Sequence, residues 1–152
     1  MDFDFSDDQV QLRDAVRKWV DKSYGFEHRR AAVRAGGCSR ATYEELAGLG
    51  LCGLYVPEEH GGMGMGPVEG MVVMEELGRG MVLEPVLQAL IAGGVISGYG
   101  DDNVKAAWLP GIASGEKLVV LAYQERAARY HLDRCAAQAS AAGADLIDHA
   151  HH

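Results

Sequence analysis

The sequence predicts a mainly α-helical fold, a bundle of about four or five helices followed by one short β-strand near 117–123. Three observations support this fold class. Segments with apolar residues at helical spacing follow one another along most of the chain. Residues typical of helix starts, such as Ser6 and Pro67, precede several of these segments. The run KLVVLAY, at 117–123, is the first with the β-branched and aromatic composition of a strand.

The first helix is predicted from Ser6 to the twenties. Ser6 and Gln9 have the spacing of a capping box, and Asp7 and Asp8 favour the positive end of the helix dipole. One face of this helix is apolar: Leu12, Val16, Trp19 and Val20. The basic continuation FEHRRAAVRAGG is expected to end in a loop at residues 36–37, which are both glycine.

The next two helices flank a glycine-rich loop. Ser39 or Thr42 can cap the second helix. Its residues expected to face inward are Tyr43, Leu46 and Leu49. Residues 50–66 have no helical period and predict a long loop. Pro67 suits the start of the third helix, because its missing N–H would be unpaired there. The expected apolar stripe of that helix is Val68, Met71, Met74, Leu77 and Met81.

Two more helices are predicted before residue 115. The first opens at Pro85 and is expected to be the most buried element, because VLQALIAGGVISGYG is apolar nearly all round. The second is capped by Asp101 or Asp102, and Pro110 is expected to interrupt it.

The strand at 117–123 needs a partner, because one strand cannot form a sheet. The tail from residue 136 contains no clear second strand. We therefore expect a helical domain at 1–115, the beginning of a β-domain at 116–135, and an irregular or disordered tail at 136–152.

Composition and charge predict a globular cytoplasmic protein that binds neither nucleic acid nor membranes. The 152 residues are 48% hydrophobic and 24% charged, with a net charge of −8, which disfavours contact with phosphate backbones. The cysteines at 38, 52 and 135 form no CxxC pair, which is typical of a reducing compartment. No apolar run reaches the roughly 20 residues of a membrane span. No metal site is expected, since the terminal histidines at 149, 151 and 152 lack a preorganised geometry.

The stretch VPEEHGGMGMGPVEGMVVMEELGRG, at 56–80, allows three interpretations: a phosphate cradle, a carboxylate site or scaffold. GGMGMG matches neither G-x-G-x-x-G nor a Gly-Lys-Ser/Thr phosphate loop, so a structural turn is favoured. Adjacent residues on a helix point in different directions. At most one glutamate of the pair Glu58-Glu59, and one of the pair Glu75-Glu76, could therefore face a site. Solvent exposure or capping is the favoured role of these carboxylates.

Three blocks, taken in order, resemble the N-terminal part of the acyl-CoA dehydrogenase family of flavoenzymes. They are MDFDFSDDQVQLRDAVRKWV, LAGLGLCGLYVPEEHGGMGMGPVEGMVVMEELGRG and WLPGIASGEKLVVLAYQE. The second is the most specific, because it carries the family's Val-Pro-Glu-Glu-x-Gly-Gly-x-Gly and Glu-Glu-Leu-Gly-Arg elements. The similarity covers about residues 1–135 and implies a helical N-terminal domain, then a β-domain and a C-terminal helical bundle.

The resemblance implies FAD as cofactor, held between domains and across a subunit interface, and Tyr123, Gln124 and Glu125 as cofactor-binding residues. In the family, a Thr-Glu-Pro loop at this place contacts the flavin and the acyl thioester. Glu125 matches that loop, whereas Gln124 and Arg126 stand in place of its Thr and Pro. No catalytic residue is expected in this chain, since the family's glutamate base lies in the C-terminal bundle.

Two functions of different classes follow from these observations. The first is an FAD-dependent acyl-CoA dehydrogenase chain, incomplete or needing a partner subunit, that acts on acyl-CoA thioesters in a homo- or hetero-oligomer. The segment RYHLD at 129–133 resembles a variant found in divergent members of the family. Some of these members work as two unlike subunits that share one active centre. The alternative is a non-catalytic helical fragment that self-associates through an exposed apolar surface. A small-molecule binder that keeps part of the acyl pocket is a third interpretation.

Overall fold

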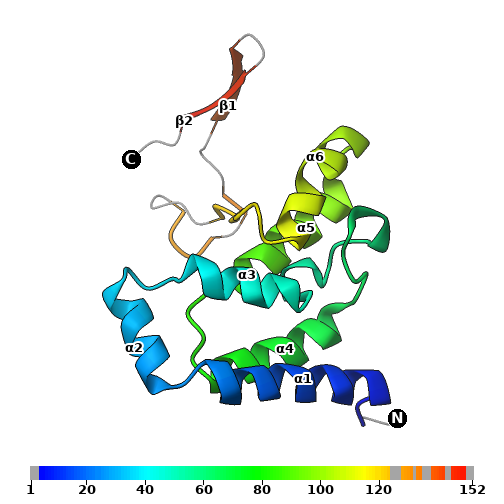
Figure 1. The fold of residues 1–152 in the computed structure, drawn as a ribbon. Helices are drawn as coiled ribbons and strands as arrows, with labels where there is room; N and C mark the ends of the chain where they lie inside the picture. The colour runs from blue at the N-terminus through cyan, green and yellow to red at the C-terminus, as the bar shows by residue number, and fades with distance from the viewer. Residues whose placement is uncertain (1–3, 124–127, 132, 135–137, 143–144, 150–152) are drawn as a thin grey trace. The chain divides into compact units, whose positions relative to one another are not determined.

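The computed structural model describes residues 4–123, 128–131, 133–134, 138–142 and 145–149. The chain divides into two compact units, Met1–Val120 and Leu121–His152. Among the described residues, the first unit contains six α-helices, which confirms the mainly α fold (Figure 1). They are α1 (Asp7–Ser23), α2 (Phe26–Arg34), α3 (Arg40–Gly48), α4 (Pro67–Arg79), α5 (Val86–Tyr99) and α6 (Asp102–Ala113). Two 3₁₀ turns, η1 (Leu51–Gly53) and η2 (Glu58–His60), lie in the predicted loop.

The helix starts follow the sequence signals closely. The predicted capping box of α1 forms: the Ser6 N–H donates to Gln9 Oε1 at 3.0 Å, and the Gln9 N–H donates to Ser6 Oγ at 3.3 Å. Ser39 caps α3, and Pro67 is the first residue of α4. The basic segment predicted as the continuation of α1 is instead a separate helix, α2, because the chain is extended at Gly25.

The core lies among α1, α3, α4, α5 and α6. Helix α1 runs beside α4 (Figure 1), α5 packs on α6, and η1 contacts α3, α5 and α6. The largest fully buried side chains are aliphatic or aromatic with one exception, Glu76. They include Tyr43, Leu46, Leu51, Leu54, Leu90, Leu109 and Ile112. This core is drawn from nearly every element of the first unit, so it holds the helices in one arrangement.

Two predicted buried faces are confirmed only in part: Leu77 of α4 and Tyr43 and Leu46 of α3 are buried, but other members of each face are exposed. In α4, Val68 and Met71 of the expected stripe are exposed, whereas Val72 and Val73 are buried. Helix α4 carries apolar side chains on two faces, and its packing against α1 selects the face with the β-branched residues. Leu49, expected to face inward from α3, is exposed at the C-terminal cap of that helix.

Helix α6 continues through Pro110 to Ala113, which corrects the predicted interruption. Proline removes one N–H from the helix but allows the helix to continue where packing compensates. Leu109 and Ile112 on either side are fully buried, so the hydrophobic burial of this turn outweighs the missing hydrogen bond.

The start of α6 offers a test of the cap assignment. The Val104 N–H donates to Asp101 Oδ1 at 2.9 Å, so Asp101 is the cap and Asp102 is the first helical residue. Asp101→Ala is expected to lower the free energy of unfolding by about 1 kcal/mol, measured by urea denaturation. Asp102→Ala, which removes only a first-turn charge, should cost about 0.3 kcal/mol. Equal losses in the two variants would contradict the assignment.

Residues 117–123 do not form the predicted strand. Their side chains do alternate: Val119 packs against the core, whereas Leu118 and Val120 are exposed. A strand requires backbone hydrogen bonds to a neighbour, and no described segment pairs with this one. The composition was that of a strand, but the pairing partner is not among the described residues.

The second unit contains an antiparallel pair of strands in the region predicted to be irregular. Strand β1 (Gln138–Ala142) pairs with β2 (Asp145–His149), with Ala142 opposite Asp145 and Gln138 opposite His149. Strand β1 is rich in alanine and β2 contains two aspartates, and both residue types are depleted in strands, which is why the sequence did not predict this pair.

Candidate functional site

Of the three predicted cofactor-binding residues, the structure describes one. Tyr123 lies in an extended stretch of chain without secondary structure, and its side chain is 59% exposed. Gln124 and Glu125 lie outside the described residues. The accessible ring of Tyr123 is available for contact with a planar aromatic group.

The segment that leads to Tyr123 begins at a tight turn after α6. Gly115 has a φ of +74° in this turn, and a Cβ atom there would lie 2.5 Å from the Ala47 Cβ. The Lys117 N–H then donates to the Gly111 carbonyl at 2.8 Å. The residues that follow include three exposed apolar side chains: Leu118, Val120 and Leu121. The chain therefore leaves α6 at a defined point and carries apolar side chains toward Tyr123.

Helix α5 presents an exposed apolar stripe, which we define as Leu87, Ile91 and Val95. These side chains are 44%, 38% and 39% exposed, and their spacing of four places them along one side of the helix. The prediction that α5 is the most buried element is therefore wrong. Its buried side combines Val86 and Leu90 with the small residues Ala89, Ala92 and Gly93. Large apolar residues therefore occur on both sides of α5, so the sequence carries no signal that separates the stripe from the buried side.

The glycine-rich loop does not form a phosphate cradle. Its backbone donors are used within the chain: the N–H groups of Met63, Gly64 and Met65 donate to the carbonyls of Gly53, Val56 and Leu54 at 3.0, 2.8 and 2.8 Å. A Cβ atom at Gly62 would lie 2.0 Å from the Val56 carbonyl oxygen, so the loop is packed against its own backbone. The loop is scaffold, as favoured from the sequence.

These residues fit FAD only in part. An exposed aromatic ring at Tyr123 and nearby apolar side chains suit one face of an isoalloxazine ring. Among the described residues, the glycine-rich loop supplies no free N–H cluster for a pyrophosphate. Among the described residues, Tyr123 is thus the one predicted flavin contact, and the glycine-rich loop offers no phosphate contact.

The glutamate pairs do not form an acid–base site. Glu58, Glu59 and Glu75 are exposed, as expected. Glu76 is only 2% exposed and contacts two arginines: Arg17 Nη2 donates to its Oε1 at 2.5 Å, and Arg79 Nε donates to its Oε2 at 2.7 Å. The hydrogen bond from Arg17 is the main cause that lowers the pKa of Glu76, against the opposing effect of burial. A carboxylate held ionised between two cations is a structural ion pair rather than a general base.

Nothing local in the sequence connects Glu76 with Arg17, since the two lie far apart along the chain and meet only where α1 packs on α4. Arg79 Nη2 also donates to Asp21 Oδ1 of α1 at 2.8 Å. The two helices are therefore joined by a four-residue ionic network around one buried carboxylate. This network was missed from sequence because only the tertiary contact reveals it.

Two hollows lie along α1. One, of about 310 Å³, is lined by Ser6, Asp8, Gln9, Leu12, Gly64, Met65, Gly66 and Glu69. Its polar groups bond one another, since Gln9 Nε2 donates to Glu69 Oε1 at 2.8 Å and the Gly66 N–H donates to Glu69 Oε2 at 3.0 Å. The other, of about 530 Å³, is open and lined by charged residues of α1 alone: Asp14, Arg17, Lys18, Asp21 and Lys22. The polar groups of the first hollow are engaged with one another, and the second is an open surface of one helix, so neither is a catalytic candidate.

The part of the chain that the structure describes offers neither a metal site nor a helix that spans a membrane. It contains no group of three His, Cys, Asp or Glu side chains placed to hold a metal ion. Within the same residues, no helix has the length and apolar character needed to cross a membrane.

Comparison with known proteins identifies the first unit. The family model described as acyl-CoA dehydrogenase, N-terminal domain, matches residues 6–116. Acyl-CoA dehydrogenase FadE12 of Mycobacterium tuberculosis is 34% identical over 144 residues, covering 93% of this chain and 37% of that protein. The (2S)-methylsuccinyl-CoA dehydrogenase of Cereibacter sphaeroides is 35% identical over 122 residues, covering 78% of this chain and 22% of its own length.

The fold is also found among solved structures. The ChsE4–ChsE5 complex from Mycobacterium tuberculosis is similar with a TM-score of 0.79 and 26% identity, covering 97% of this chain and 38% of that chain. The chain therefore spans well under half of the length of each relative that it matches.

Proposed function

Since this chain belongs to the acyl-CoA dehydrogenase family, we propose that it supplies the helical wall of the acyl and flavin site in an FAD-dependent acyl-CoA dehydrogenase. The observation that carries the proposal is the apolar stripe of α5, defined above. A row of large apolar side chains exposed along one side of a helix is suited to contact a hydrocarbon. The family match supports the acyl chain of a thioester as that hydrocarbon.

The residues of this chain bind and shield rather than transfer protons. The stripe gives apolar contact to the acyl chain and excludes water from its surface. Tyr123 offers its ring to the flavin, with Gln124 and Glu125 as the neighbouring contacts carried over from the resemblance. When bound, FAD supplies the two-electron acceptor for desaturation of the α,β bond of the thioester. The carboxylate that takes the α-proton is not assigned to this chain.

The working enzyme is proposed to be a homo- or hetero-oligomer of acyl-CoA dehydrogenase subunits. Support comes from the ChsE4–ChsE5 structure, which is described as a complex. The cytoplasmic location stays a prediction from the cysteine pattern and composition. The first unit on its own provides one side of the proposed pocket, so the chain without further subunits or domains is expected to be inactive.

The experiment is a titration in two steps. The chain is first titrated with FAD, alone and with a candidate partner subunit of the family, and flavin fluorescence is followed. The FAD-loaded preparation is then titrated with acyl-CoA thioesters, and reduction of an artificial electron acceptor is measured. If no preparation takes up FAD or responds to any thioester, the proposal is rejected.

A variant of the stripe gives a sharper test. Ile91→Asp is expected to weaken acyl-CoA binding at least about tenfold, because a carboxylate would be desolvated against the acyl chain. Val33→Asp on α2 is the matched control, since Val33 is also exposed and apolar but lies on another helix. The dissociation constant is measured by titration calorimetry on the FAD-loaded preparation. If both substitutions weaken acyl-CoA binding equally, the stripe does not line the acyl pocket.

A further inference from the structure

We infer that Arg40 and Lys117 form a clamp that fixes where the chain leaves the helical unit, which makes them positioning residues for the segment leading to Tyr123. The clamp is defined as these two side chains together with the carbonyls of Ala107, Gly115 and Glu116. Arg40 lies outside the sequence motifs described above, and Lys117 is the first residue of the segment 117–123 that was predicted to be a strand. The inference rests on the proposed function for the role of Tyr123, whereas the clamp itself rests on the contacts within Met1–Val120.

Arg40 holds the turn after α6 from the side of α3. Its Nη2 donates to the Gly115 carbonyl at 2.6 Å and to the Glu116 carbonyl at 2.8 Å. Its Nε donates to Glu44 Oε1 at 2.9 Å, one turn further along α3. An exposed ion pair of this kind adds little stability, but it orients the planar guanidinium toward the two carbonyls.

Lys117 holds the same turn from the side of α6. Its Nζ donates to the Ala107 carbonyl at 2.8 Å and lies 4.6 Å from the centre of the Trp108 ring. An ammonium over an indole face is attracted by the electron-rich ring. A Cβ atom at Gly111 would lie 2.8 Å from the Lys117 Cγ and Cδ, so the lysine stem runs along α6 over a glycine.

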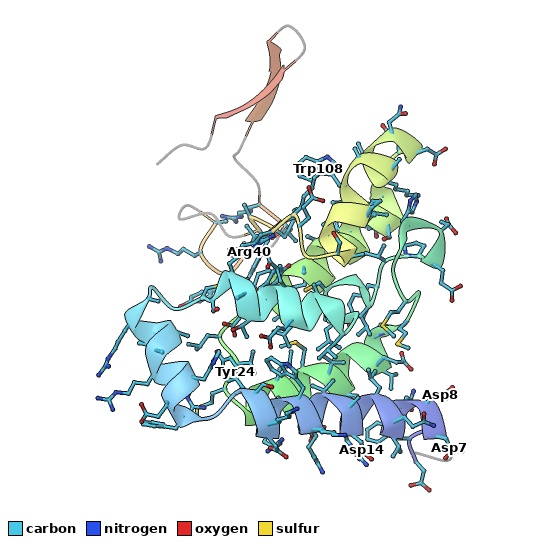
Figure 2. All side chains as sticks on the ribbon, viewed as in Figure 1. Asp7, Asp8, Asp14, Tyr24, Arg40 and Trp108 are labelled. Carbon is cyan, nitrogen blue, oxygen red and sulfur yellow. The ribbon has the colours of Figure 1, made fainter. Side chains whose placement is uncertain are left out.

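Arg40 therefore reaches the turn from α3, while Lys117, which belongs to the segment after the turn, connects that segment back to α6. In Figure 2, Arg40 and Trp108 lie on the same side of the helical unit, above α3 in this view. Gly115 closes the arrangement, since its missing side chain allows the turn to rest on Ala47 of α3. Most of these contacts involve half-exposed side chains, which contribute little to global stability but restrict the local backbone.

The chain leaves this turn toward a functional residue. Val120 is the last residue of the first unit, and only two residues separate it from Tyr123. The turn therefore sets the point from which the segment to Tyr123 starts. A contact between a side chain and a cofactor weakens when the side chain shifts by about 1 Å. A clamp that fixes the start of the segment would therefore help Tyr123 to contact the flavin.

The variants are Arg40→Ala and Lys117→Met. Each has a matched control on a different surface: Arg30→Ala on α2 and Lys18→Met on α1, where the same change of charge is made away from the turn. Chymotryptic cleavage after Leu118, Leu121 or Tyr123 is followed by mass spectrometry under native conditions. Amide hydrogen exchange of the peptide covering 116–123 and the urea midpoint are measured in parallel.

We expect cleavage within 118–123 to be about tenfold faster in both clamp variants, with faster exchange of the Lys117 amide and an unchanged urea midpoint. Lys117→Met should also change the fluorescence emission of Trp108. Both controls should behave as the wild type. If cleavage is no faster than in the controls, or if the urea midpoint falls in step with it, the clamp is rejected in favour of an ordinary structural contact.

The role in flavin placement is decided separately. In a preparation that binds FAD, the clamp variants are expected to weaken FAD binding about tenfold. Unchanged FAD affinity with faster cleavage would show a clamp without a positioning role and overturn the inference. If the wild type binds no FAD in any preparation, the proposed function fails, while the cleavage measurement still decides whether the clamp exists.

Discussion

Replacing Gly62 by alanine is expected to lower the free energy of unfolding by about 3 kcal/mol, the upper end of what overpacking costs. The new Cβ would lie 2.0 Å from the Val56 carbonyl oxygen and 2.4 Å from the Val56 Cβ. Backbone cannot rotate away as a flexible side chain can, so the loop would have to shift. The Gly64 N–H also donates to this same carbonyl, and that hydrogen bond would be lost as the loop moves.

Gly78→Ala is the matched control for this prediction. Gly78 lies in the last turn of α4, and an added Cβ there would meet no atom within 4 Å. Alanine is favoured over glycine in a helix, so this variant is expected to be more stable by about 0.5 kcal/mol. Urea denaturation of both variants gives the comparison. A loss below about 1 kcal/mol for Gly62→Ala would mean that the loop is looser than the structure shows.

Glu76→Gln is expected to produce the second large effect, a loss of about 2 kcal/mol of unfolding free energy at neutral pH. The substitution keeps the shape of the side chain but removes the charge that accepts hydrogen bonds from Arg17 and Arg79. It also turns an amide N–H₂ toward guanidinium donors, which leaves a buried polar group without an acceptor. The packing of α1 on α4 should weaken in consequence.

The loss should depend on pH in a defined direction. The pKa of Glu76 is lowered in the folded protein, so its ionised form stabilises the fold above the ordinary value of 4.5. This contribution is lost as pH falls below 4.5 through the lowered pKa of the folded state. The difference in stability between wild type and Glu76→Gln should therefore be constant near neutrality and shrink in acid. It is measured by urea denaturation at a series of pH values.

The control for this pair of experiments is Glu75→Gln. Glu75 is exposed beside Glu76 on α4. Its replacement by glutamine changes the net charge by the same amount as Glu76→Gln. Its effect is expected to stay within about 0.5 kcal/mol at every pH. A loss at Glu75 comparable to that at Glu76 would show that overall charge, rather than the ionic network with Arg17, controls stability.

The candidate site was only partly predictable from sequence. Tyr123, Gln124 and Glu125 came from the family resemblance, and of these only Tyr123 has a described place in the structure. The α5 stripe was not predicted, since a helix that is apolar on all sides gives no hydrophobic period from which to choose a face. The contacts of Arg40 with the Gly115 turn were equally invisible, because they join residues far apart in sequence.

The sequence by itself determined where most helices begin and which family the chain belongs to. The Ser6–Gln9 capping box, the Ser39 cap and the Pro67 start act within about one helical turn, so the residues that decide them are neighbours in the chain. The Val56–Gly64 and Glu75–Arg79 elements were diagnostic for the same reason, as contiguous patterns that can be recognised without a structure.

Only the tertiary structure decided which faces are buried and which charges are paired. In the folded chain, the face of α4 with Val72 and Val73 is buried, and α6 continues through Pro110. Arg17 contacts Glu76. The tertiary structure also left 117–123 without strand pairing. The physical reason is common to all of these outcomes: burial, ion pairing and strand pairing depend on a second segment, and its position is set by the packing of the whole core.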